Sequence, residues 1–208
     1  MGGEAENHGD ERREGLGTKP VLVGERVILR PFTEADIVAM GPILADPEVL
    51  KLTGSVHSTR DAESADPRLD AATRTWYEGL AARNDRLDLA VVDAAGGHCV
   101  GEVVLNNLDA ENRSCGFRIL LGPAGRNRSL GSEATALLLE HAFSNTTLHR
   151  IALEVYDFNP RARHVYERAG FSLEGTARAA LLFDGQFIDA HVFSILATDP
   201  RPGPAARS

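Results

Sequence analysis

A short basic segment that contains a glycine is the part of the sequence best suited to hold a phosphate group. It reads RNRSLGSEA and covers residues 126–134. The residues that follow have the spacing of an amphipathic helix, and a helix N-terminus offers unsatisfied N–H groups and the positive end of the helix dipole. Arg126 and Arg128 add positive charge, and Gly131 would let an anion approach the backbone. The segment therefore suits a phosphate-bearing ligand.

The same segment also fits a polar loop in front of a surface helix, with Ser132 as the helix cap. It is not a P-loop, because GxxxxGK[ST] is absent. It is not a dinucleotide fingerprint either, since no GxGxxG follows a strand with an acid about 20 residues on. These residues alone do not separate the two interpretations.

The elements that must position this segment predict a mixed α/β or α+β chain with helices packed on a sheet. Thr33 and Asp36 have the spacing of a capping box, residues 51–60 resemble a loop, and Asp184-Gly185 is typical of a hairpin turn. The expected order is a strand in 25–32, helices in 33–45 and 68–83, antiparallel strands in 87–93, 98–107 and 114–121, a helix after residue 131, a strand in 150–156, a helix in 159–171 and a closing strand pair in 171–196.

Length and composition favour one domain. The chain has 208 residues, and we predict that 21–197 form a single domain between disordered tails at 1–20 and 198–208. The net charge of −8 disfavours nucleic-acid binding. No apolar run reaches the roughly 18 residues of a membrane helix, and the first 20 residues lack the apolar core of a signal peptide, so we expect a cytoplasmic protein with no membrane partner. Two cysteines, Cys99 and Cys115, form no disulfide or zinc pattern, and the histidines form no ligand set, so no metal is predicted.

The second half of the chain carries a family resemblance. The segment LHRIALEVYDFNPRARHVYERAGFSLEGTAR contains Asn159, Tyr166 and the pair Gly170-Phe171. Together with Arg126 to Gly131, which fit a loop pattern [R/Q]-x-x-G-x-[G/A] except at Ser129, it resembles the GNAT superfamily of acyl-CoA-dependent N-acyltransferases. The likeness runs from about Gly24 to Leu196 and looks most like the RimJ/RimL branch.

The resemblance implies acetyl-CoA bound where two neighbouring parallel strands of a mixed central sheet, residues 114–121 and 150–156, splay apart. Backbone groups of the first strand would pair with the pantetheine arm, and the basic loop would hold the pyrophosphate. Simple N-capping is the alternative for Asn159, and a surface charge is the alternative for each arginine. The implied cofactor-binding residues are Ile119, Leu120, Leu121, Arg126, Asn127, Arg128, Ser129, Leu130, Gly131, Ser132, Asn159 and Arg163.

Two residues are candidates for the chemistry. The resemblance implies that Tyr166 protonates the departing thiolate, with core packing beside Phe171 as the alternative. Strand alternation allows Glu102 to face the acceptor and act as the base. The alternatives are that Glu102 is only an exposed strand residue, that His57 reaches the acceptor amine, or that a water chain removes the proton. Trp76 and Tyr77 are candidate acceptor contacts.

Ser129 departs from the glycine usual at its position. If that backbone needs a positive φ, serine is strained by about 1 kcal/mol. If glycine only leaves room, the serine hydroxyl can donate to phosphate, and this second explanation is the one we favour from the sequence.

The expected function is acetyl transfer from acetyl-CoA to a primary amine, either a protein N-terminus or a small molecule, by direct attack in a ternary complex. One alternative is an acyltransferase that uses another donor such as succinyl-CoA. The other is a non-catalytic module that binds acyl-CoA. Apolar residues in the closing strands also suggest a homodimer, by analogy with the family.

Overall fold

The computed structural model describes residues 15–200. The strands are β1 (Leu22–Val23), β2 (Val27–Arg30), β3 (Leu87–Asp93), β4 (Cys99–Asp109), β5 (Ser114–Leu121), β6 (Arg150–Tyr156), β7 (Ser172–Phe183) and β8 (Gln186–Leu196). The helices are α1 (Glu34–Leu44), α2 (Pro47–Leu52), α3 (Thr59–Glu63), α4 (Ala71–Gly79), α5 (Leu130–Asn145) and α6 (Pro160–Ala169), with 3-10 turns at Leu80–Ala82 and Pro123–Gly125.

Within residues 15–200, eight strands join one mixed sheet in the order β1-β2-β3-β4-β5-β6-β8-β7. Every neighbouring pair is antiparallel except β5 and β6, which run parallel. The three antiparallel strands predicted in the middle of the chain are confirmed as β3, β4 and β5. The mixed α/β fold with splayed strands is therefore confirmed.

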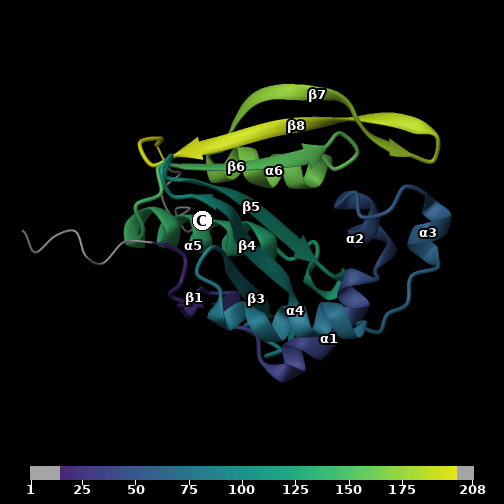
Figure 1. Ribbon diagram of the computed structural model, residues 1–208, viewed down its shortest axis with the longest axis horizontal. Helices are drawn as coiled ribbons and strands as arrows, with labels where there is room; N and C mark the ends of the chain where they lie inside the picture. The colour runs from purple at the N-terminus through teal and green to yellow at the C-terminus, as the bar shows by residue number, and fades with distance from the viewer. Residues whose placement is uncertain (1–14, 201–208) are drawn as a thin grey trace, which may run out of the picture.

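Helices cover both faces of this sheet, as Figure 1 shows. On one face α5 and α6 pack on the strands through residues such as Leu138 and Tyr166. On the other face α1, α2 and α4 contribute Met40, Val49 and Tyr77 to a second, smaller core. The sheet thus separates two apolar layers, and a site between β5 and β6 can be reached by side chains from both.

Local signals placed several elements correctly. The predicted capping box is present at the start of α1, where Thr33 accepts from the Asp36 N–H and the Asp36 carboxylate accepts from the Thr33 N–H. The turn at Asp184-Gly185 joins β7 to β8. Residues 51–60, expected as a loop, instead include the end of α2 and the start of α3, because Asp46 and Ser58 cap those two short helices.

The N-terminal boundary of the domain needs a correction. Residues 15–20 were expected in a disordered tail, yet Leu16 is buried in the larger core. Lys19 donates to the carbonyl oxygens of Leu16 and Arg86, which ties this segment to the body. Residues 198–200 of the predicted C-terminal tail are also described, and Asp199 Oδ2 accepts from the Leu196 N–H at 2.9 Å. Residues 1–14 and 201–208 lie outside the described residues.

The tip of the β7–β8 hairpin reaches the segment before α3, and Figure 1 shows the two side by side. The Asp184 N–H donates to the His57 carbonyl oxygen at 2.9 Å, and Asp184 Oδ1 accepts from the Thr59 N–H at 2.9 Å. His57 Nδ1 lies 3.0 Å from the Leu182 carbonyl oxygen. The hairpin therefore anchors the segment that follows α2 over the sheet. Within residues 15–200, no helix is long and apolar enough to span a bilayer.

Candidate active site

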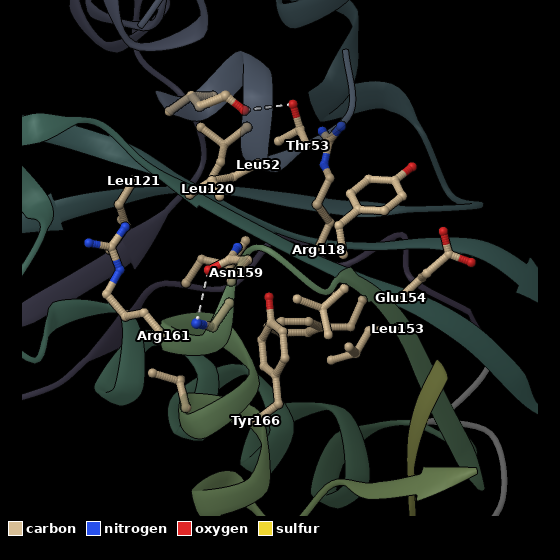
Figure 2. A pocket seen from close by; sticks show the side chains of 18 of the residues that line it. Leu52, Thr53, Arg118, Leu120, Leu121, Leu153, Glu154, Asn159, Arg161 and Tyr166 are labelled. Carbon is tan, nitrogen blue, oxygen red and sulfur yellow. Dashed lines mark hydrogen bonds between the residues drawn. The ribbon is translucent and has the colours of Figure 1, made fainter. Parts of the chain in front are cut away.

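The parallel contact between β5 and β6 is short, and the strands separate beyond it. Only Ser114–Gly116 pair with Arg150–Ala152, so the second half of β5 has no strand partner on that edge among residues 15–200. A pocket of about 900 Å³ occupies the gap and continues to the N-terminus of α5. Figure 2 shows side chains from β5, β6 and α6 around it. The geometry exposes backbone donors and acceptors on β5 to a bound chain.

The strand residues proposed from the sequence lie at this pocket. Ile119, Leu120 and Leu121 all line it. Leu120 is 6% exposed and packs into the smaller core, so its side chain is structural. These residues therefore contact a ligand mainly through the backbone N–H and C=O groups on the unpaired edge of β5.

The basic loop reaches the pocket through most, but not all, of its residues. Those that line the pocket are Arg126, Asn127, Ser129, Leu130, Gly131 and Ser132. Helix α5 begins at Leu130, so the N–H groups of its first turn open toward the gap. Ser132 lies inside that turn, and Ser129, not Ser132, is the N-cap residue.

Ser129 has a left-handed backbone with φ of 60°. Our preferred explanation, that glycine is usual there only to leave room, is therefore wrong for this chain. A non-glycine residue in this region costs about 1 kcal/mol. Asn127 also has a positive φ, 58°, which asparagine tolerates better. Two left-handed residues in one short loop turn its backbone toward the helix start.

Arg126 links the loop to α2. Its guanidinium donates to Glu48 Oε2 at 2.7 Å and to Asp46, and its Nε–H donates to the Leu121 carbonyl oxygen at 3.0 Å. Arg161 on α6 donates to the other oxygen of Glu48 at 2.6 Å. Glu48 therefore bridges two arginines that both line the pocket.

Two of the expected cofactor residues do not reach the pocket. Arg128 turns away and donates to Asp93 Oδ2 at 2.7 Å and to the Ala124 carbonyl oxygen. Arg163 forms an exposed pair with Glu167 one helical turn further along α6. Arg161 lines the pocket instead, and the sequence argument missed it. Its position two residues after Asn159, at the first turn of α6, was the available signal.

Tyr166 lies at the centre of the pocket wall. Its side chain is 7% exposed and packs edge-on against Phe117 and Phe171 with ring centroids 6.0 and 5.9 Å away. Figure 2 shows its hydroxyl directed into the space between β5 and β6. Within residues 15–200 this hydroxyl has no hydrogen-bond partner, and burial raises its pKa. Tyr166 therefore stays protonated at neutral pH and can donate a hydrogen bond to a ligand.

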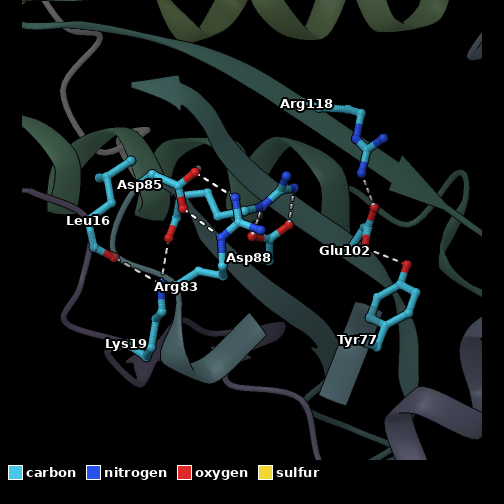
Figure 3. Close-up of polar contacts among 9 residues, drawn as sticks. Leu16, Lys19, Tyr77, Arg83, Asp85, Asp88, Glu102 and Arg118 are labelled. Carbon is cyan, nitrogen blue, oxygen red and sulfur yellow. Dashed lines mark hydrogen bonds and ion pairs between the residues drawn. The ribbon is translucent and has the colours of Figure 1, made fainter. Parts of the chain in front are cut away.

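Glu102 does not line the pocket. It is 1% exposed on β4, accepts from the Tyr77 hydroxyl at 2.8 Å and accepts from Arg118 Nη2 at 2.6 Å (Figure 3). Burial raises the pKa of the carboxyl group. A base must reach its substrate directly or through one water, and this carboxylate is covered by Arg118 and Tyr77. The geometry therefore does not support the direct base that strand alternation suggested.

Of the remaining candidate residues, some line the pocket and others do not. Asn159 lines the pocket and also caps α6, because its side-chain oxygen accepts from the Ala162 N–H at 3.1 Å. His57 binds the β7–β8 hairpin instead of facing the pocket. Trp76 is 42% exposed and lies against Arg83 and Arg86. Among residues 15–200, no group of three or more His, Cys, Asp or Glu side chains is arranged to hold a metal ion.

The chain belongs to a known family. Residues 26–172 match the model described as acetyltransferase (GNAT) domain, which confirms the family that the sequence resembled. Spermidine N(1)-acetyltransferase of Vibrio cholerae is 30% identical over 106 residues, or 51% of this chain and 61% of that protein. The chain thus matches about three fifths of that relative. The L-amino acid N-acetyltransferase AaaT of Escherichia coli is 28% identical over 168 residues, covering 79% of this chain and 94% of that protein.

Solved structures agree on the fold. A crystal structure of spermidine N-acetyltransferase from Vibrio cholerae in complex with CoA and spermine superimposes with a TM-score of 0.71 at 22% identity, covering 84% of this chain and 98% of that chain. A GCN5-related N-acetyltransferase from Brucella melitensis gives 0.67 at 22% identity, covering 91% and 84%. At these identities the likeness concerns the fold alone.

Proposed function

We propose that this protein transfers an acetyl group from acetyl-CoA to a primary amine in a ternary complex. One observation carries the proposal: the pocket joins the free edge of β5, the Tyr166 hydroxyl and the N-terminus of α5 in a single space. The family membership and the relatives named for acetyl transfer to amines support the same reaction.

The free edge of β5 suits the pantetheine arm of the donor. Pantetheine contains two amide groups in an extended chain, so backbone atoms of Ile119 to Leu121 can pair with it as another strand would. The open N–H groups at the start of α5 suit the pyrophosphate. Arg126 and Arg161 bring positive charge to that end of the pocket.

The reaction requires a neutral amine, a stabilised oxyanion and a proton for the departing thiolate. Tyr166 supplies that proton in the proposed mechanism, because it is protonated, faces the pocket and has no other described partner. Glu102 is not assigned as the base. Bulk water beside the exposed carboxylate of Glu154 receives one proton from the ammonium group before attack. The second proton, which the nitrogen loses after attack, returns to the Tyr166 oxygen and restores the acid.

An assay for thiol release tests the proposal. The protein is incubated with acetyl-CoA and a panel of amines, amino acids and peptides, and free CoA is measured with a thiol reagent. We expect amine-dependent release and stabilisation of the fold by CoA in a thermal melt. Stabilisation by CoA with no release on any acceptor would instead support a non-catalytic binding module. Substituting succinyl-CoA in the same assay tests the other donor.

Finer features belong to the same proposal. A RimJ/RimL-like branch is supported by similarity to a putative ribosomal N-acetyltransferase of Bacillus subtilis, 25% identical over 177 residues. A homodimer is supported by exposed Leu173, Leu182 and Phe187 on β7 and β8. A cytoplasmic location is supported by two free cysteines, Cys99 and Cys115, as is usual in reducing compartments. Gel filtration and light scattering test the dimer.

A further inference from the structure

Two oppositely charged side chains lie on the same side of the sheet where β5 and β6 separate, one on each strand. Gly116 and Ala152 are the last parallel pair, and two residues further along their strands come Arg118 and Glu154. Because side chains alternate along a strand, these residues keep the face of the last pair. Both line the pocket, and no ion pair joins them. Figure 2 shows them rising from separate strands above Tyr166.

The position of the Arg118 guanidinium is fixed by a buried residue on the neighbouring strand. Its Nη2 donates to Glu102, which is buried and also accepts from Tyr77 (Figure 3). The side chain of Arg118 is nevertheless 47% exposed. A guanidinium has five N–H donors in a planar fork, and Glu102 accepts from one nitrogen. The contact therefore fixes the fork while leaving donors open to the pocket.

Glu154, unlike Arg118, has no partner in the described part of the chain that fixes its charged group. It is exposed on β6, and within residues 15–200 it forms no hydrogen bond or ion pair. The other charged residues that line the pocket are Arg126 and Arg161, both at the phosphate end. We call the part of the pocket lined by Arg118 and Glu154 the acceptor end; it presents one oriented cation and one free anion.

We propose that the acceptor is a small amine that also carries a carboxylate, such as a free amino acid. Arg118 binds the carboxylate through its fork, and Glu154 binds the ammonium group before transfer. Glu102 is then a positioning residue for Arg118. A polyamine fits less well, because it would place several positive charges beside Arg118 with one lining carboxylate to balance them. This inference rests on the proposed function and deepens it.

Matched acceptors test the inference. The thiol-release assay compares an amino acid with its carboxamide and with the decarboxylated amine, and includes spermidine. We expect kcat/KM to be at least about tenfold higher for the amino acid, as for a lost charged hydrogen bond. In Arg118→Gln, kcat/KM for the amino acid should fall by about 10- to 100-fold and that for the carboxamide by less than about threefold.

Three further variants separate binding from folding. Arg150→Gln changes an arginine outside the pocket and should leave the discrimination unchanged. Glu102→Gln should raise KM for the amino acid but not KM for acetyl-CoA, which a general loss of structure would not do. If Arg118→Gln fails to fold, Arg118→Lys retains the charge without the fork and should lose part of the discrimination.

The outcomes distinguish this inference from the proposed function. Thiol release that favours decarboxylated amines or spermidine, or discrimination that survives in Arg118→Gln, overturns carboxylate recognition and leaves acetyl transfer standing. Absence of release with every acceptor overturns both. A peptide whose second residue is acidic, if preferred over free amino acids, would overturn the choice of a small acceptor.

Discussion

The two ends of the pocket are charged in different ways. At the phosphate end, Arg126 and Arg161 share Glu48, whose side chain is 46% exposed, so an entering phosphate competes with an anion already in place. At the acceptor end, Arg118 is also paired, but its partner Glu102 lies buried behind it. An exposed partner lowers the charge that a ligand meets, whereas a buried partner orients the cation and leaves its outer donors open.

The largest expected effect comes from Tyr166, which lies where the two ends meet. Tyr166→Phe should lower kcat about 100-fold or more, because it removes the proposed acid and retains the ring packing. Burial raises the pKa of this tyrosine, so the acid stays protonated from pH 7 to 9, and its ionisation should not lower kcat in that range. Steady-state kinetics across pH check both statements.

The affinity for CoA distinguishes a catalytic role of Tyr166 as the acid from a structural role in the core. Calorimetry should give a CoA affinity for Tyr166→Phe within about threefold of the parent, because an interaction made only in the transition state contributes to kcat and not to ground-state binding. An unchanged kcat would remove Tyr166 as the acid and leave it as a core residue beside Phe117 and Phe171.

Substituting two glutamates, one buried and one exposed, compares how much each carboxylate contributes to stability. Glu102→Gln should lower the free energy of unfolding by about 1–3 kcal/mol, because Arg118 and Tyr77 lose a charged partner. Glu154→Gln should change it by less than about 0.5 kcal/mol, as is usual at exposed sites. Urea denaturation measures both. Equal effects would mean that the buried contact contributes no more than the exposed surface.

A substitution at the phosphate end should have a smaller effect, and it should strengthen ligand binding instead of weakening a function. Glu48→Gln should strengthen CoA binding by up to about fivefold, since it releases Arg161 from an exposed pair worth about 1 kcal/mol at most, while Arg126 keeps its contacts with Asp46 and the Leu121 carbonyl oxygen. Glu174→Gln, which breaks an exposed pair with Arg150 away from the pocket, is the matched control. Weaker CoA binding in Glu48→Gln would show that Glu48 holds the arginines in place for phosphate instead of competing with it.

The smallest effect concerns the loop between the two ends. Ser129→Gly relieves a left-handed backbone worth about 1 kcal/mol, but glycine gains about 0.4–1 kcal/mol of entropy in the unfolded chain. The free energy of unfolding should therefore change by less than about 1 kcal/mol, measured by urea denaturation. Ser132→Gly, inside the first turn of α5, relieves no such strain and should only destabilise. A loss of more than about 1 kcal/mol in Ser129→Gly would contradict the strain.

Features with local causes were predictable from the sequence, and features with distant causes were not. The capping box at Thr33 and the turn at Asp184-Gly185 involve neighbours in the chain, and both are present. Strand alternation allowed Glu102 to face the acceptor side, but the contacts that cover it come from residues 25 positions before and 16 positions after it. Spacing alone does not show which side chain will cover another.

The arginines illustrate the same limit at the pocket. The sequence favoured Arg128 and Arg163, whereas the structure brings Arg161 to the pocket and turns Arg128 to Asp93. Loop direction depends on the positive φ at Ser129, which no side-chain pattern specifies. The position of the gap was predictable only through the family resemblance, because a strand that loses its neighbour has the same sequence pattern as one that keeps it.

The place of β8 in the sheet has a consequence for the order of folding. β6, which forms one wall of the pocket, has three residues paired with β5 but seven paired with β8, the last strand of the described part of the chain. During synthesis, residues 150–156 therefore leave the ribosome well before their main partner, 186–196. The loop and helix at the phosphate end precede both, so the wall that carries Glu154 is completed late, after the rest of the cleft has been made.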